Sequence, residues 1–188
     1  MADSPAVVAV AAAVAVGKSI MTDNFYLQLI NSDKLGKIID LAKEIWPKTY
    51  ASILSVEQIT YMMDLMYSEE KLKQEFQSGI LFYLMKLNHK EIGYTTVEPN
   101  YKDEPQLYIH KNYILPNLQG KGFGQKAIAA LVQIAQQHKL NSILLNVNRR
   151  NQALDFYKKT GFVIEREEDI PIGNDYWMND YVMRKQLT

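Results

Sequence analysis

The sequence predicts one α/β domain of the α+β kind, in which about four helices flank a mixed, mostly antiparallel sheet of about six to seven strands. Its 188 residues are enough for one domain with a large core and too few for two comfortable ones. Segments with helical apolar spacing also alternate with short segments typical of strands. Their order, β-α-α-β-β-β-α-β-α-β-β, requires both antiparallel hairpins and parallel crossovers.

The helices are predicted from apolar spacing and from end signals. After a first strand at residues 25–30, Ser32 caps a helix that we expect Pro47 to end, because proline lacks the N–H that a helix interior needs. Ser55 begins a second helical region that continues to Phe76. Two later helices are expected, one beginning near Gly122 and one over residues 151–161.

The remaining strands are apolar segments bounded by turn residues. They are residues 80–87, 92–99, 106–115, 142–148, 162–172 and 175–187. The first two form a hairpin across the turn NHKE, and the last two form another around Gly173 and Asn174. The strands therefore supply the antiparallel part of the sheet, and the helices between them supply the crossovers.

An unbroken run of Ala and Val from Ala6 to Val16 sets the N-terminal segment apart. The run is too short to span a bilayer as a helix, and it lacks the preceding Lys or Arg and the cleavage site of a signal peptide. We therefore interpret residues 1–20 as an Ala/Val-rich appendage of natural or artificial origin, and residues 21–188 as the domain.

Charge and composition limit the kind of partner. The chain has 21 basic and 21 acidic residues and a pI near 6.8, so no basic excess indicates nucleic acid or a membrane surface. It has no Cys, which excludes disulfides, Cys-ligated metals and a thiol nucleophile. We therefore expect a cytoplasmic protein with a small-molecule ligand, without a metal and without nucleic-acid or membrane partners.

A glycine-rich segment, NLQGKGFGQKAIAALVQIAQQH, precedes one predicted helix and suggests phosphate binding. A P-loop is excluded because Gly122 follows Lys121 where a Ser or Thr is required. A dinucleotide fingerprint matches formally through Gly122, Gly124 and Ala127. However, the acidic residue expected about twenty positions later is missing.

A third interpretation uses two motifs together. QGKGFG, from Gln119 to Gly124, fits the pattern Gln/Arg-x-x-Gly-x-Gly/Ala after Pro116, and NQALDFYKKTGF, from Asn151 to Phe162, follows about thirty residues later. Both motifs, in this order, resemble those of the GCN5-related N-acetyltransferases, which transfer an acetyl group from acetyl-CoA to an amine. The resemblance covers about residues 24–187 and implies this family's fold.

The resemblance implies an acetyl-CoA site around the glycine loop. Glycines let backbone N–H groups approach the pyrophosphate, and the helix dipole points at it. A backbone N–H at Ile114 or Leu115 is expected to stabilise the oxyanion of the thioester carbonyl. The expected acetyl-CoA-binding residues are Ile114, Leu115, Gln119, Gly120, Lys121, Gly122, Phe123, Gly124, Gln125, Asn151 and Tyr157.

Tyr157 is the candidate acid, because the resemblance implies that its hydroxyl points toward the CoA sulfur. A phenol with a pKa near 10 keeps its proton at neutral pH and can donate it to the leaving thiolate. The chain has no Cys to carry an acyl group, which favours direct attack by the amine in a ternary complex.

The attacking amine must lose a proton, so a base or a water chain is needed. Period-two alternation puts Tyr108, His110, Asn112 and Ile114 on one face of a predicted strand. His110 is the candidate base because its pKa is near neutrality, and Glu98 on the neighbouring hairpin is the alternative.

The acceptor is less clearly indicated. Aromatic and acidic residues in the helical region suit a cationic amine. With the segment DYVM near the C-terminus, this region is similar to that of small bacterial acetyltransferases, a group that includes polyamine acetylators. A peptide α-amine and an amino sugar remain alternatives, as does a non-catalytic acyl-CoA sensor. A monomer and a homodimer both fit. The helical residues concerned are Trp46, Tyr50, Glu57, Tyr61 and Asp64.

Overall fold

A computed structural model describes residues 24–187, and its strands form one seven-stranded sheet in the order β1-β2-β3-β4-β5-β7-β6. All neighbouring strands are antiparallel except β4 and β5. This confirms the predicted fold class. The predicted appendage, residues 1–20, lies outside the described residues. The strands are β1 (Phe25–Leu29), β2 (Leu81–Leu87), β3 (Lys90–Pro99), β4 (Gln106–Ile114), β5 (Ser142–Asn148), β6 (Val163–Gly173) and β7 (Tyr176–Gln186).

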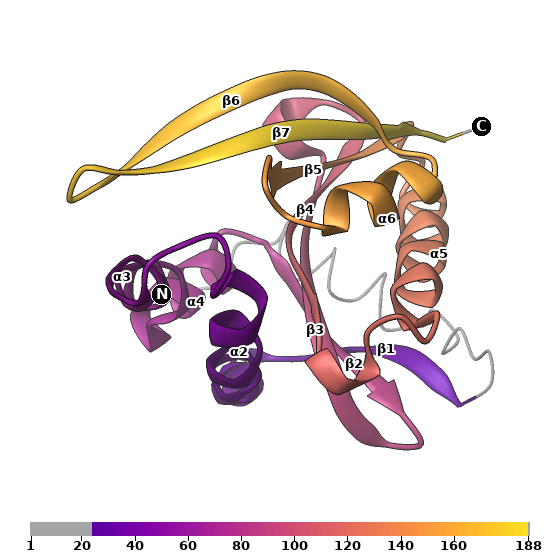
Figure 1. The fold of residues 1–188 in the computed structure, drawn as a ribbon. Helices are drawn as coiled ribbons and strands as arrows, with labels where there is room; N and C mark the ends of the chain where they lie inside the picture. Colours follow the sequence, from indigo (N-terminus) through magenta and orange to yellow (C-terminus); the bar gives the residue numbers. More distant parts are fainter. Residues whose placement is uncertain (1–23, 188) are drawn as a thin grey trace.

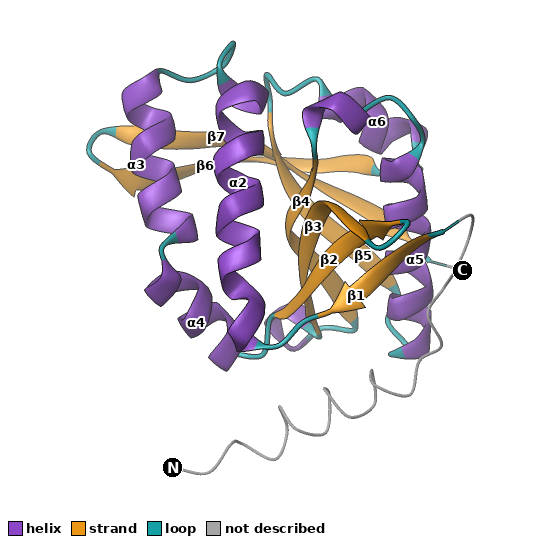
Figure 2. Ribbon diagram, turned by 90° about the horizontal axis from the view of Figure 1, so that it is seen from below, coloured by secondary structure: helices purple, strands orange, loops and turns teal. Residues whose placement is uncertain are grey.

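Five α-helices within residues 24–187 cover the two faces of the sheet (Figures 1 and 2). Helices α2, α3 and α4 share one apolar core with β2 and β3, whereas α5 and α6 pack with β4 and β5 in a second core. The helices are α2 (Leu35–Tyr50), α3 (Val56–Tyr67), α4 (Glu69–Gln77), α5 (Phe123–Gln137) and α6 (Ala153–Lys159). None of these helices is long and apolar enough to cross a membrane.

The helical region predicted from Ser55 to Phe76 is divided into α3 and α4 by Ser68. The backbone of Ser68 leaves the helical conformation, and its side chain accepts a hydrogen bond from Lys71 N–H, which caps α4. This division explains why the structure has one helix more than the roughly four that the sequence predicts.

The expected end of α2 at Pro47 is wrong, because the helix continues to Tyr50. Proline in a helix costs about 3 kcal/mol, since it removes a backbone hydrogen bond. Packing of the last turn compensates: the Tyr50 ring lies 4.6 Å from the Trp46 ring and 6.5 Å from the Tyr113 ring, measured between centroids. Burial of Tyr50 against a strand far along the chain therefore keeps the turn helical.

Strands β4 and β5 separate after a short parallel pairing. Only residues 106–109 of β4 pair with residues 142–145 of β5. Beyond that point β4 continues along β3, and β5 continues along β7 (Figure 1). The sheet is therefore open between the C-terminal ends of its two parallel strands, where ligands of α/β sheets commonly bind.

A β-bulge changes the side-chain alternation of β4. Thr96 of β3 pairs with Lys111 and Val97 pairs with Ile109, so His110 is the extra residue of the bulge. A bulge inserts one residue into the strand, and so it exchanges the faces of the residues on its two sides.

The face exchange is visible in the two cores. Ile109 packs on the α5 side before the bulge, and Ile114 packs on that side after it. Tyr113 instead faces α2. The expectation that Tyr108 and Ile114 share one face is therefore wrong, because regular alternation is interrupted at His110.

Gly93 of β3 should not accept a side chain. A Cβ there would overlap the backbone carbonyl of Tyr113, so Gly93→Ala should force β3 and β4 apart and lower the free energy of unfolding by about 2 kcal/mol. The matched control is Gly36→Ala in α2, where no atom lies within 4 Å of the new Cβ. This control should be neutral or stabilising by up to about 1 kcal/mol. Equal effects of both variants in urea unfolding would contradict the assigned close approach.

Candidate active site

The separation of β4 and β5 opens a cleft with a volume of about 860 Å³. Its "loop side" is lined by residues 119, 120, 122, 124 and 125 of the glycine loop and by residues 151–153, 156 and 157; Lys121 and Phe123 of the loop lie outside the lining. Its "helix side" consists of residues from α2, α3, α4 and the β6–β7 hairpin, together with the facing residues of β4 and β5. The cleft thus runs through the sheet and brings the two sequence motifs to one edge of it.

The glycine loop ends in the N-terminus of α5. Gly120 and Gly122 have positive φ angles of 73° and 83°, and Gly122 is the N-cap. The first helical hydrogen bond runs from Lys126 N–H to Gly122 O. The N–H groups of residues 123–125 therefore precede the helical ladder and point out of the helix end, as an anion site requires.

Gly124 is needed for packing between two helices, and not to let the backbone approach a ligand. A Cβ at this position would lie 3.0 Å from the ring of Phe156 in α6. The loop is also anchored to β1, because the Phe123 ring stacks on the Phe25 ring with their centroids 6.0 Å apart. Gly124 thus allows the second motif to pack directly against the first.

Backbone bonds distinguish the two candidate oxyanion donors. Leu115 N–H donates to Ile92 O at 2.9 Å, so it is engaged within the sheet. Successive N–H groups of a strand point to opposite edges, so the N–H of Ile114 points toward the open cleft. The Ile114 carbonyl, on that same edge, accepts from Gln119 Nε2 at 3.1 Å. Of the two, Ile114 is the group that lines the cleft.

Tyr157 and Asn151 lie together on the loop side. Burial raises the pKa of the Tyr157 hydroxyl, so this group keeps its proton at neutral pH. Asn112 Nδ2 donates to the Tyr157 hydroxyl oxygen at 3.4 Å, which leaves the hydroxyl proton free to point elsewhere. Asn151 Oδ1 accepts from Ala153 N–H at 2.9 Å and fixes the start of α6.

His110 lines the cleft and is held by Glu98 from β3. Nε2 of His110 lies 2.8 Å from Glu98 Oε2, and the imidazole packs edge-on against the Tyr108 ring at 4.7 Å. Burial lowers the pKa of His110, and the hydrogen bond to Glu98 opposes part of this shift. The imidazole is therefore neutral at pH 7 and able to accept a proton. The two alternative bases predicted from the sequence form one hydrogen-bonded pair.

Only part of the predicted acceptor region lines the cleft. Trp46 and Tyr50 do, whereas Glu57 and Asp64 are exposed and lie outside its lining. Tyr61 lies outside the lining but contacts the β6–β7 hairpin. Its hydroxyl donates to Ile172 O at 2.6 Å and so connects the tip of that hairpin to α3.

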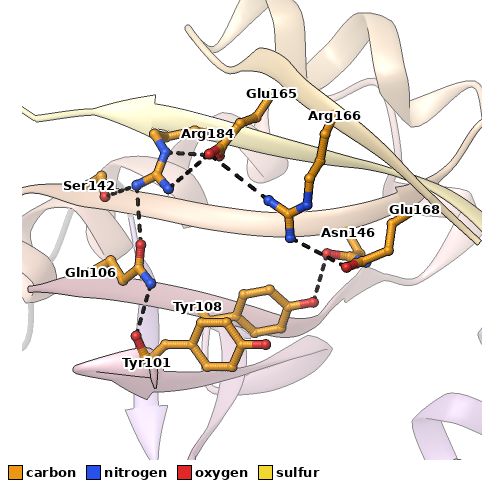
Figure 3. Close-up of polar contacts among 9 residues, drawn as sticks. All are labelled: Tyr101, Gln106, Tyr108, Ser142, Asn146, Glu165, Arg166, Glu168 and Arg184. Atoms are coloured by element: carbon orange, nitrogen blue, oxygen red, sulfur yellow. Dashed lines mark hydrogen bonds and ion pairs between the residues drawn. The ribbon is translucent and has the colours of Figure 1, made fainter. Parts of the chain in front are cut away.

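Several polar residues of the helix side had no signal in the sequence. Tyr108 donates to Asn146 Oδ1 at 2.9 Å, and Asn146 Nδ2 donates to Glu168 Oε2 at 2.8 Å (Figure 3). Asp180 is 7% exposed and also contacts Asn146. These residues come from four different strands, so no motif in the chain groups them. Two signals in the sequence concern Asp180: it begins the segment DYVM, and strand alternation in β7 puts it on the same face as the buried Val182.

A buried ion pair closes the far end of the helix side. Lys111 Nζ lies 2.6 Å from Glu75 Oε2, and their side chains are 8% and 11% exposed. Burial lowers the pKa of Lys111, and Glu75 offsets part of that shift. The charge of Lys111 is thereby neutralised within the wall of the cleft.

The sequence matches the acetyltransferase (GNAT) family over residues 38–162. It is similar to a spermidine N(1)-acetyltransferase of Thermoplasma acidophilum, with 28% identity over 158 residues that span 81% of this chain and 94% of the relative. The chain therefore belongs to the GNAT acetyltransferase family, and it is an N-acetyltransferase that depends on acetyl-CoA.

Solved structures agree with this assignment. The PaiA N-acetyltransferase of Thermoplasma acidophilum, in complex with coenzyme A, has a TM-score of 0.72 and 25% identity over 89% of this chain and 100% of that one. A GCN5-related N-acetyltransferase from Rhodopseudomonas palustris has a TM-score of 0.73 and 20% identity, covering 91% of this chain and 100% of that one. The second likeness concerns the fold.

Gly124→Val should weaken coenzyme A binding at least about tenfold, a loss of roughly 1.4 kcal/mol. The branched side chain would push Phe156 away and displace the start of α5. Isothermal titration calorimetry measures the effect, and Ala129→Val at an exposed position of the same helix is the control. Wild-type affinity in folded Gly124→Val protein would exclude the loop as the pyrophosphate site.

Proposed function

We propose that the protein transfers the acetyl group of acetyl-CoA directly to a primary amine of a small, polyamine-like molecule in a ternary complex. The observation that carries the proposal is the cleft itself: a helix start suited to an anion, Tyr157 and His110, which Glu98 holds from behind, all border one space. The printed name of the Thermoplasma relative, a spermidine N(1)-acetyltransferase, supports the acceptor class.

The loop side would bind acetyl-CoA. The N–H groups at the start of α5 receive the pyrophosphate, with Gln119, Gly120, Lys121 and Gln125 around it and Asn151 at the far end of the loop side. The Ile114 N–H would stabilise the oxyanion that forms when the amine attacks the thioester carbonyl. No protein nucleophile is needed, because the amine itself forms the new C–N bond and the thiolate leaves.

Proton transfers would use the two titratable groups at the cleft. Neutral His110, oriented by Glu98, accepts the proton of the amine directly or through a water. Tyr157 donates its proton to the departing CoA thiolate, and Asn112 holds its oxygen. Both groups are in the protonation state that these roles require at pH 7.

The charge of the helix side favours a cationic acceptor. Lys111 is neutralised by Glu75, and Lys48, the other lysine of the lining, is paired with Glu44, which leaves the carboxylate of Asp180 as the unpaired charge of this wall. The aromatic residues Trp46 and Tyr50 also line this space. A peptide or protein N-terminal amine and a non-catalytic acyl-CoA sensor are the alternatives. The cytoplasmic location and the monomeric or dimeric state stay predictions.

Thiol release from acetyl-CoA across polyamines, amino sugars and short peptides tests the proposal. We expect polyamines to give the highest kcat/KM. Highest activity on peptides would favour the N-terminal acetyltransferase alternative, and coenzyme A binding without turnover on any amine would indicate the sensor.

Tyr157→Phe should lower kcat by about 10²-fold or more and leave coenzyme A affinity unchanged, because the variant loses the proton donor and little packing. Tyr26→Phe, which removes a hydroxyl that contacts His89 away from the cleft, is the matched control. Stopped thiol-release assays with the best acceptor measure kcat. An unaltered kcat in Tyr157→Phe would remove Tyr157 as the acid.

His110 should give kcat/KM an acid limb below pH 6.5. Burial lowers the pKa of His110, so the neutral imidazole is lost only as the pH falls through that lowered value. The limb is read after kcat/KM has been corrected for the fraction of acceptor amine that is unprotonated at each pH. Glu98→Gln should move the limb to lower pH, because Glu98 raises the pKa of His110. In an Asp180→Asn background, where the Asp180 carboxyl cannot add a limb of its own near pH 6, His110→Ala should abolish the limb and reduce the rate by about 10²-fold. A limb that persists in His110→Ala would exclude His110 as the base.

A further inference from the structure

Asp180 of β7 is a buried carboxylate that faces the cleft. It is 7% exposed and lines the helix side together with Trp177 and Met178 of the same strand. The roles proposed above for Tyr157, His110 and Ile114 do not use it. Burial of an ionised carboxylate is costly unless a positive charge or several hydrogen-bond donors compensate.

The protein supplies little such compensation to Asp180. Arg149 is within electrostatic reach, but its guanidinium is held by Glu167 and Asp169 of β6. Glu168 adds a further negative charge, and the nearby Asn146 amide, which donates to Glu168, lowers the pKa of Asp180 only in part. No ion pair within residues 24–187 includes Asp180.

The lack of compensating charge also affects the pKa of Asp180. Burial, followed by the charge of Glu168, raises the pKa of Asp180 to about 6. Its carboxyl is therefore mostly ionised at pH 7. The two lysines that line the cleft do not compensate it, because Lys48 pairs with Glu44 and Lys111 pairs with Glu75. A positively charged ligand in the cleft would supply the missing counter-charge.

Tyr50 lies between the environments of Asp180 and Tyr157, since both residues affect its pKa. Its hydroxyl hydrogen-bonds with that of Tyr113 at 2.9 Å, and both Asp180 and Tyr157 are within electrostatic reach of it. Burial raises the pKa of Tyr50 to about 12, so the residue is neutral. Asp180 and Tyr50 thus both line the helix side of the cleft, whereas Tyr157 lines the loop side.

We propose that Asp180 binds a second positive charge of the acceptor, so that the cleft prefers diamines and polyamines to monoamines of the same chain length. The inference rests on the proposed function and deepens it. One amino group is acetylated near Tyr157, and the other, protonated, pairs with Asp180.

The test compares putrescine with butylamine, and cadaverine with pentylamine, in wild type and Asp180→Asn. Each pair differs in one terminal ammonium. We expect the wild type to prefer the diamine by about tenfold or more in kcat/KM, mainly through KM, since one favourable charge pair is worth roughly 1.4 kcal/mol. Asp180→Asn should reduce this preference to about the twofold that two equivalent amino groups give, with a clearly smaller loss of kcat/KM for the monoamine than for the diamine.

Asp175→Asn is the matched control, because Asp175 is an exposed acid at the turn of the same hairpin. It should keep the wild-type preference. An undiminished preference in Asp180→Asn, equal losses for both members of each pair, or no diamine preference in the wild type would each overturn the inference.

A binding measurement separates this inference from the proposed function. Calorimetric titration of putrescine into the coenzyme A complex should show a Kd about tenfold weaker for Asp180→Asn than for the wild type. This result requires no turnover, so it supports the charge-binding role even if another amine proves to be the substrate. Equal affinities would overturn that role while leaving acetyl transfer intact.

Discussion

The site depends on the short parallel pairing of β4 with β5. Four residue pairs hold the strands together, and each strand then follows its own antiparallel partner. The divergence leaves one edge of β4 without a strand partner and makes the cleft a gap in the sheet. A backbone N–H such as that of Ile114 can serve a ligand only because the ladder has ended there.

The bulge at His110 adds a second constraint at the same position. It turns His110 toward the Glu98 of β3, and it lets Asn112 face Tyr157 on the opposite side of the strand. A regular strand would put all these side chains on one face. The proposed base and acid are thus presented from different sides of one strand, as attack and departure at a carbonyl carbon require.

Features with a local cause could be predicted from the sequence, and features with a distant cause could not. Strand β5 has the predicted bounds, and the glycine loop starts the predicted helix, because apolar spacing and glycine act within a few residues. The extension of α2 past Pro47 depends on Tyr113, and the bulge at His110 depends on the register of β3. The environment of Asp180 is assembled from three strands, so its charge balance exists only in the folded chain.

The close contact between Gly124 and Phe156 packs the two sequence motifs directly against each other. The loop that would hold the donor's phosphates rests on the same short helix that carries Tyr157. A residue at either position therefore restricts which residues its counterpart can be. We therefore expect the two positions to vary together in evolution, because a larger residue at 124 requires a smaller one at 156.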